Sequence, residues 1–241
     1  MRIFVVIPAY NESTTIESVI KEVKHYCPNI VVVDDGSSDD TAKIAERAFS
    51  AMPNIQSTVI RYEKNRGKGF AVKTGLIAAT ADVALFSDAD LSTPIDEMSK
   101  LVDPILSDEC DVAFGSRALD RSLIGTHQPW RREQGGRVMN FIIRTMSGLP
   151  FADTQCGFKA FNLTKFRPLL DVMRIDRFGF DVEFLFVANY HKLRLKEIPV
   201  RWNDVEGSKV SVFRDTRRMI SELNQIRSNA RTGIYDKIQT G

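Results

Sequence analysis

The sequence has few cysteines, few histidines and no long apolar run. Its three cysteines and three histidines lie far apart in 241 residues, so they form neither a zinc-binding pattern nor a disulfide framework. A chain without a disulfide framework is expected in a reducing compartment. No apolar stretch is long enough to span a bilayer, and the first residues do not form a signal peptide. We therefore expect a cytoplasmic protein, at most peripheral on the cytoplasmic face of a membrane.

The charges of the chain nearly cancel. It has 33 lysines and arginines and 31 aspartates and glutamates, which gives a formal net charge of +2. Nucleic-acid binding needs a basic stripe that neutralises phosphates, so we expect no nucleic-acid partner. A hydrophobic share of 43% is typical of a soluble protein with a sizeable core. Because no repeat, low-complexity tract or clear linker interrupts the chain, residues 1–241 are predicted to form a single domain.

The first half of the chain alternates strand and helix patterns. Strands are expected at 3–7, 30–33, 56–62, 82–86 and 111–115, and helices at about 14–26, 39–51, 69–79 and from Thr93 onward. Strands that are apolar on both faces and alternate with helices indicate an α/β fold, with a mostly parallel central sheet flanked by helices. Ligands bind such sheets at the carboxyl ends of the strands. Three polar clusters directly follow strands and are predicted to converge on that edge.

The second half of the chain changes character. Residues 116–136 are polar, rich in arginine and expected to be irregular, and long loops of this kind are usually functional or disordered. A helix is expected at 138–146, a strand at 196–202 and a terminal helix at 214–231. The terminal helix carries an apolar stripe with arginines beside it. It either packs on the core, which we favour, or lies in a membrane interface.

Asp88 and Asp90 form the most informative pair in the sequence. They follow the apolar run 83–86, and because side chains alternate along a strand, both carboxylates project to the same side. Ionised and unpaired, they would repel each other, and a divalent cation would relieve that repulsion. Mg²⁺ and Mn²⁺ favour oxygen ligands, and Mg²⁺ is usually held by one or two carboxylates and the phosphates of a substrate. The alternative for Asp-x-Asp at a strand end is a simple turn.

Two further turns between a strand and a helix carry polar clusters. Asp34 and Asp35 begin an Asp-Gly turn with a helix cap, which does not by itself require two adjacent carboxylates at a strand tip. An acidic group there would accept hydrogen bonds from a nucleoside base or ribose. The segment 64–69 combines lysine, arginine and glycine, which suits a phosphate contact, although an exposed basic loop fits equally well.

Arginines and acidic residues of the second half add candidates. Arg117 and Arg131 lie in or beside the irregular segment, where arginine forks suit phosphate oxygens or a salt-bridged surface. Asp181 and Glu183 form a second acidic pair, either at the site or on the polar face of an element. Cys156 has no evident base beside it, so it is expected to be a small buried residue rather than a nucleophile.

Four motifs of the first half lie at 6–12, 33–41, 65–69 and 88–90. Taken in order, they resemble the family 2 glycosyltransferases, which have the GT-A nucleotide-diphospho-sugar transferase fold. Motifs of the second half narrow the resemblance to the dolichyl-phosphate glucosyltransferase branch, close to the dolichyl-phosphate mannose synthases. These motifs lie at 115–117, 153–159, 180–183 and 205–209. The resemblance implies a nucleotide-binding half at 1–115, an acceptor half at 116–213, and a basic helix with a tail at 214–241.

The resemblance implies a role for each motif, and an inverting transfer of a hexose (glucose first, mannose next) from a nucleoside diphosphate sugar to a polyprenyl phosphate. Asp88 and Asp90 would hold Mg²⁺ or Mn²⁺ at the diphosphate. Arg117 and Arg131 would receive the acceptor phosphate. Residues expected to bind the donor are Pro8, Ala9, Tyr10, Glu12, Asp35, Lys64, Lys68, Asp88 and Ala89. Residues expected to take part in catalysis are Asp90, Arg117, Arg131 and Asp181, and those lining the sugar pocket are Gln155, Cys156, Gly157 and Phe158.

One departure and three alternatives accompany this interpretation. Several mannose synthases have glutamine two residues after the second aspartate, where this chain has Ser92, which puts the family's third protein metal ligand in doubt. The chain could instead serve a non-lipid saccharide acceptor, since the first half would look the same. An inactive sugar-nucleotide-binding protein is a second alternative, disfavoured because both Asp88 and Asp90 are present. A pyrophosphorylase-like enzyme would normally have a glycine-rich loop after the first strand, which is absent here.

Overall fold

The computed structural model of the protein describes residues 2–52, 56–126, 130–205 and 212–238. Side chains 130–132 and 212–216 fall outside that description. The motif at 205–209 therefore lies largely beyond the described residues, and so does the side chain of Arg131.

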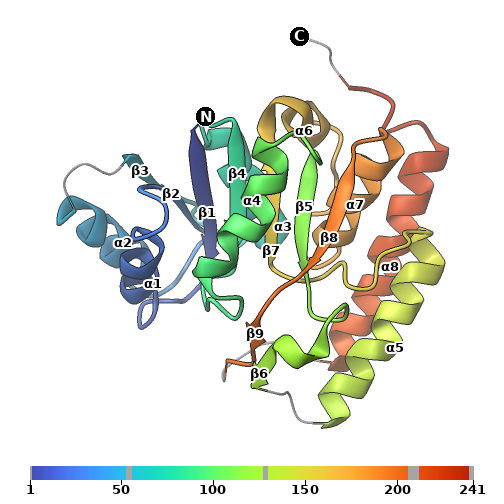
Figure 1. Ribbon diagram of the computed structural model, residues 1–241, viewed down its shortest axis with the longest axis horizontal. Coiled ribbons are helices and arrows are strands. Elements are labelled where there is room, and N and C mark those ends of the chain that lie inside the picture. Colours follow the sequence, from blue (N-terminus) through green and yellow to red (C-terminus); the bar gives the residue numbers. More distant parts are fainter. Residues whose placement is uncertain (1, 53–55, 127–129, 206–211, 239–241) are drawn as a thin grey trace.

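A seven-stranded sheet forms the centre of the molecule (Figure 1). Its strands stand in the order β3-β2-β1-β4-β7-β5-β8. β7 runs antiparallel to β4 and β5, whereas the other paired strands run parallel. This confirms the predicted α/β fold with a mostly parallel central sheet. The strand bounds are β1 Ile3–Ala9, β2 Asn29–Asp34, β3 Gln56–Arg61, β4 Val83–Ser87, β5 Val112–Ser116, β7 Phe158–Asn162 and β8 Leu195–Pro199.

Helices cover both faces of the sheet, as predicted (Figure 1). One face packs against α1 (Ile16–Val23), α2 (Thr41–Ser50) and α4 (Met98–Leu106). The other face packs against α3 (Lys68–Ala78), α6 (Leu163–Leu170) and α7 (Phe180–Tyr190). On this second side α5 (Trp130–Ser147) and α8 (Val212–Arg231) pack against each other. Short 3₁₀ helices lie at Ile95–Glu97 and Arg121–Leu123.

Alternation along the strands divides the core into two layers. In β1, Phe4 and Val6 join the cluster on the α3 side, whereas Val5 and Ile7 join the cluster on the α1 side. Successive side chains of a strand point to opposite faces of the sheet. Because both faces are covered, the strand must be apolar at every position, which explains the unbroken apolar runs in the sequence.

The sequence analysis did not predict β7. Its residue Lys159 interrupts an otherwise apolar stretch, and a lysine in the middle of a short run argues against a buried strand. In the structure the Lys159 side chain is fully buried, and β7 inserts between β4 and β5. The strand is stable there because the lysine finds a carboxylate partner, which the local sequence pattern does not reveal.

The segment predicted to be irregular up to residue 136 is more ordered than expected. β6 (Ile124–Thr126) pairs with β9 (Trp202–Asn203), and α5 already begins at Trp130. The arginines and paired glycines of this stretch indicated a loop, but packing of α5 against α8 and α7 supports the helix. The strand expected at 196–202 is divided in the structure, since β8 ends at Pro199, which cannot donate to a continuing ladder.

The terminal helix α8 packs on the core through its apolar stripe. Met219, Leu223 and Ile226 are buried in the cluster that also holds the side chains of α7. The favoured interpretation of this helix is therefore confirmed, and its stripe faces protein. Within the described residues no helix is both long and apolar enough to cross a bilayer.

Candidate functional site

The carboxyl ends of the parallel strands bring most of the predicted residues to one edge of the sheet. β1, β2 and β4 are neighbours, so the residues that follow them, Tyr10, Asp35 and Asp88, are adjacent in space. Because β7 runs the other way, the segment before its first residue, 153–157, lies at the same edge. Arg117 follows β5 at the far end of this row. The backbone of Arg131 lies in α5, but its side chain is outside the described residues.

The turns after β1 and β2 hold each other in place. The backbone N–H of Asn11 donates to Ser37 Oγ at 2.9 Å, and its side-chain oxygen accepts from the Ser38 N–H at 2.9 Å. The N–H of Glu12 donates to Thr41 Oγ1 at 2.8 Å, and the Glu12 carboxylate accepts from Thr15 Oγ1 at 2.9 Å. Pro8 and Ala9 are buried in β1, whereas the Tyr10 ring is exposed at the tip. A rigid turn with one exposed ring suits a nucleoside-binding surface.

Asp35 organises the loop that follows β3. Its carboxylate accepts hydrogen bonds from the Asn65 side chain at 2.9 Å and from the N–H groups of Arg66 at 2.8 Å and Gly67 at 2.9 Å. Burial raises the pKa of Asp35, and the bonds from Arg66 and Gly67 oppose that shift. Gly67 has φ of 113°, and a Cβ there would lie 2.4 Å from the Asp176 carbonyl oxygen. The loop therefore requires both this aspartate and this glycine.

That loop places Lys68, the first residue of α3, beside Asp88. The Lys68 ammonium lies 2.6 Å from Asp88 Oδ1. Burial acts to lower the pKa of Lys68, but the carboxylates of Asp88, Asp181 and Asp90 outweigh it and hold that pKa above its usual value. Lys64, the other lysine of the motif, is exposed in the loop. The structure thus places Lys68, and not Lys64, at the acidic pair.

Asp90 is the more accessible carboxylate of the pair. Its side chain is exposed, and its Oδ1 accepts from the Ser92 N–H at 2.9 Å. The Ser92 carbonyl in turn accepts from the Asn203 N–H at 2.8 Å, which fixes the turn after β4 to β9. Ala89 between the two aspartates is buried. In the part of the chain that the structure describes, no group of three or more histidine, cysteine, aspartate or glutamate side chains converges as a metal cage.

Arg117 is held by a buried carboxylate that the sequence analysis assigned no role. Arg117 Nε lies 2.6 Å from Asp153 Oδ2, and a second guanidinium nitrogen lies 2.9 Å from Oδ1. Burial acts to raise the pKa of Asp153, but Arg117 outweighs it and the pKa is lowered. The Asp153 N–H donates to Glu197 Oε1 at 2.7 Å. This bidentate pair orients the guanidinium and leaves part of its donor set for a ligand.

Lys159 and Asp181 form a second buried pair. The Lys159 ammonium is 2.5 Å from Asp181 Oδ1 and 2.5 Å from the Cys156 carbonyl oxygen. Lys159 was not predicted as a site residue, because a lysine inside a strand gives no local signal of its partner. Asp181 and Glu183 lie on helix α7, where residues two apart do not share a face. Glu183 accordingly points away, and accepts from the N–H groups of Arg174 and Ile175 and from the Tyr235 hydroxyl.

The predicted sugar-pocket segment packs against Asp88, one member of the acidic pair. Gly157 accepts from the Asp88 N–H at 3.0 Å, and Gln155 donates its N–H to Asp153 at 3.0 Å. Burial raises the pKa of the Cys156 thiol to about 11, so this cysteine is protonated at neutral pH, as its predicted non-nucleophilic role requires. Phe158 is fully buried in the core at the start of β7.

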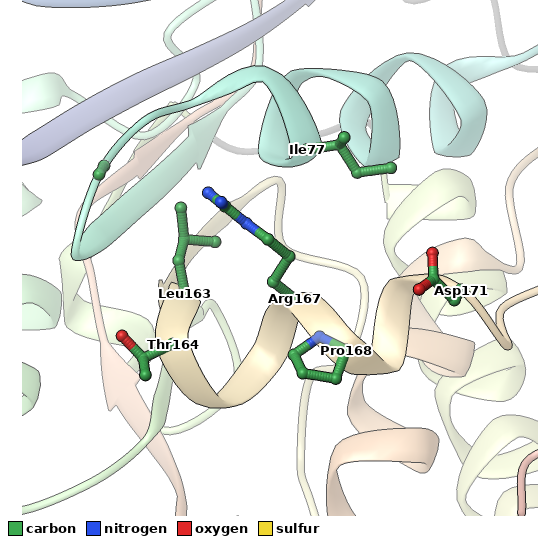
Figure 2. A pocket seen from close by; sticks show the side chains of 7 residues that line it. Ile77, Leu163, Thr164, Arg167, Pro168 and Asp171 are labelled. Atoms are coloured by element: carbon green, nitrogen blue, oxygen red, sulfur yellow. The ribbon is translucent and has the colours of Figure 1, made fainter. Parts of the chain in front are cut away.

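A groove between α3 and α6 lies away from the sheet edge that carries the predicted site residues (Figure 2). Ile77, Leu163, Arg167 and Asp171 line a cavity of about 430 Å³. Arg167 donates to the Ala79 carbonyl oxygen across it. Ile77 is near the opposite end of α3 from Lys68, so this groove contains none of the residues gathered at the sheet edge.

Comparison with known proteins agrees with this fold. The chain superimposes on a glucosyl-3-phosphoglycerate synthase of Mycobacterium tuberculosis with a TM-score of 0.68 at 22% identity, over 93% of this chain and 80% of that chain. This likeness identifies the fold as that of a GT-A glycosyltransferase. Residues 4–170 match the description "Glycosyl transferase family 2". The chain belongs to this family and is a glycosyltransferase.

Curated relatives are similar over nearly the whole chain. The dolichyl-phosphate beta-glucosyltransferase of Saccharomyces cerevisiae is 33% identical over 96% of this chain and 75% of its own length. The human protein of the same name is 31% identical over 98% of this chain and 78% of its own length. The predicted resemblance to this branch of the family is confirmed. Another solved complex of the M. tuberculosis synthase, with a TM-score of 0.67 at 20% identity, contains Mn²⁺ and UDP-glucose.

Proposed function

We propose that this protein transfers glucose from UDP-glucose to a dolichyl or other polyprenyl phosphate, with inversion at the anomeric carbon. The observation that carries the proposal is the similarity, over 96–98% of the chain, to dolichyl-phosphate beta-glucosyltransferases. The geometry supports it, because the residues proposed to bind the nucleoside, the diphosphate and the acceptor follow one another along a single sheet edge. Mannose from GDP-mannose is the next donor to consider.

The donor would lie across the ends of β2, β1 and β4. Tyr10 and Glu12 contact the nucleoside in this proposal, with Asp35 beneath it holding the 65–67 loop. Lys68 and the first turn of α3 then face the diphosphate, where a cation and helix N–H groups favour negative charge. The sugar would extend toward the segment 155–157 and Asp181.

The acidic pair suits Mg²⁺ or Mn²⁺. Two carboxylates project from the end of β4, and Asp90 is exposed. No further metal-capable side chains converge there in the described part of the chain, so the remaining ligands would be diphosphate oxygens and water, as is usual for Mg²⁺. When bound, such an ion neutralises the charge that develops on the leaving diphosphate.

The acceptor would approach from the β5 end of the row. A phosphomonoester has its second pKa near ~6, so it is largely ionised at neutral pH and needs little help from a general base. It does need charge compensation as two anions approach, and Arg117 and Arg131 are proposed to supply it. Asp181 is bound to Lys159, which suits a role in shaping the sugar pocket rather than in removing a proton.

Transfer of labelled sugar into organic-extractable lipid tests the proposal. Polyprenyl phosphate and Mg²⁺ or Mn²⁺ would be supplied with UDP-glucose or GDP-mannose in parallel. We expect labelled lipid from UDP-glucose, and a loss of at least about 100-fold in Asp90→Asn, because removing a group that stabilises developing charge costs factors of this order. If protein that binds a nucleotide forms no labelled lipid with either donor, the lipid acceptor is rejected and a non-lipid acceptor takes its place.

Contact with the membrane is proposed through α5 rather than α8. Val138 and Phe141 are 60% and 71% exposed, one helical turn apart, and the exposed Arg137 and Arg144 flank them. An apolar pair with basic neighbours complements an anionic bilayer surface.

We expect Val138→Ser with Phe141→Ser to weaken binding to anionic liposomes by at least about tenfold, since burying one large apolar side chain is worth roughly 1.5–3 kcal/mol. Co-sedimentation with the liposomes measures the binding of each variant. The double variant Tyr26→Ser with Ile77→Ser changes two comparably exposed residues, one in the turn after α1 and one on α3, and serves as the control, which should bind as the natural protein does. Equal binding by both double variants would reject α5 as the contact.

A further inference from the structure

The Lys68 ammonium occupies one side of the Asp88 carboxylate. Its Nζ lies 2.6 Å from Asp88 Oδ1, and both side chains are about one-third exposed, at 32% and 28%. Lys68 also lies over the Phe86 ring, with Nζ 5.4 Å from the ring centroid. The pair is thus partly accessible to a ligand. The ammonium directly contacts Asp88, which is one of the two carboxylates proposed to bind the metal.

The opposite side of the same carboxylate faces the backbone of Gly157, immediately before β7. The Asp88 N–H donates to the Gly157 carbonyl at 3.0 Å, and a Cβ on Gly157 would lie 2.0 Å from Asp88 Oδ2 and 2.3 Å from its Cγ. Asp88 therefore cannot swing toward β7. Its carboxylate stands between Gly157 and Lys68, and the ammonium occupies its Oδ1.

The position of Lys68 is imposed by the fold. The Asp35 carboxylate holds residues 65–67 through three hydrogen bonds, and the Phe70 N–H donates to the Asp176 carbonyl at 3.0 Å, which anchors the first turn of α3. The backbone of Lys68 is thus fixed, while rotation about the bonds of its four-carbon side chain can bring the ammonium to another nearby anion. A diphosphate placed at the start of α3 would be such an anion.

We propose that Lys68 is an exchangeable counter-ion of Asp88: it holds the carboxylate while the donor site is empty and moves to the diphosphate when the nucleotide enters, so that a divalent cation gains Asp88 only together with the nucleotide. The inference rests on the proposed function, because it assumes a diphosphate donor and a metal at the acidic pair. Two cations at one carboxylate repel each other, so the lysine and the metal compete. Because binding couplings are reciprocal, metal and nucleotide strengthen each other by the same factor.

Mn²⁺ binding without acceptor tests the proposal. Titration calorimetry or the electron paramagnetic resonance signal of free Mn²⁺ would be recorded with the natural protein and with Lys68→Met, which keeps the stem and removes the charge. Without nucleotide, we expect the variant to bind Mn²⁺ at least tenfold more tightly. With saturating UDP, or GDP in a parallel series, the natural protein should gain at least tenfold in Mn²⁺ affinity and the variant clearly less.

Lys21→Met on α1 is the control, because it also removes one positive charge, from a surface pair with Glu17. It should bind Mn²⁺ as the natural protein does. Mn²⁺ affinity in Lys68→Met no higher than in the natural protein, with circular dichroism confirming that the variant is folded, would overturn the counter-ion role. The comparison without nucleotide tests the counter-ion role whether or not the protein glucosylates a lipid. A failure of the counter-ion role and a failure of the proposed transfer reaction would therefore appear in different experiments.

Discussion

Replacing Gly157 with alanine should reduce kcat/KM at least about 100-fold while leaving the protein folded. A Cβ at this position would lie 2.0 Å from Asp88 Oδ2, far inside any real contact. Either the carboxylate or the segment just before β7 must shift, and a misplacement of about 1 Å can cost a factor of this size. The measurement is steady-state transfer to the lipid acceptor, together with thermal unfolding of both proteins.

Gly136→Ala is the matched control for this substitution. Gly136 is an exposed glycine inside α5, with nothing within 4 Å of the added Cβ. Alanine in an exposed helix interior is favoured over glycine by roughly 0.5–1 kcal/mol, so this variant should be as active and slightly more stable. Natural activity in Gly157→Ala would show that the close packing of Asp88 against β7 does not matter for turnover.

Replacing Lys159 with methionine should cost about 3–5 kcal/mol of folding free energy. Lys159 is fully buried, and its ammonium contacts the buried carboxylate of Asp181 and the Cys156 carbonyl. Removing one partner of a buried pair leaves the other charge uncompensated. Since whole domains are stable by only about 5–15 kcal/mol, the loss should be plain in urea unfolding curves.

A second variant separates the buried charge from simple packing loss. Lys159→Met combined with Asp181→Leu replaces the pair by apolar groups, and such replacements are often neutral or stabilising. We therefore expect the double variant to recover most of the lost stability, while Lys21→Met, at an exposed pair, changes it by at most about 1 kcal/mol. If the double variant is less stable than Lys159→Met alone, the destabilisation of Lys159→Met arises from the shape of the site and not from the unpaired carboxylate of Asp181.

Local sequence patterns were sufficient to predict the strands that are buried on both faces of the sheet. The apolar runs at 3–7, 30–33 and 82–86 predicted strands of a mostly parallel sheet, and the structure forms β1, β2 and β4 there as neighbouring parallel strands. A strand buried on both faces must be apolar at every position. An unbroken apolar run in the sequence therefore also indicates a strand in the interior of a sheet that is covered on both faces. The polar residues after each strand therefore had to meet at one edge, and the predicted cluster of Asp35, Asp88 and their neighbours followed from chain order alone.

The partners of the charged groups could not be predicted in this way. Lys159 with Asp181 and Arg117 with Asp153 join residues 22 and 36 positions apart, across elements whose pairing only the fold determines. The sequence therefore missed β7, since a lysine in a strand looks unfavourable until its carboxylate is in place. It also left both Lys64 and Lys68 as donor-binding candidates, and only the structure shows that Lys68 contacts Asp88.

The sequence by itself determined the alternating α/β architecture, the edge of the sheet that carries the candidate site and the family to which the chain belongs. Only the tertiary structure decided which charges neutralise each other and how closely Gly157 packs against Asp88. The physical reason is range: side-chain periodicity and turn chemistry act over a few residues, whereas the energy of a buried charge depends on whichever group the whole fold places beside it.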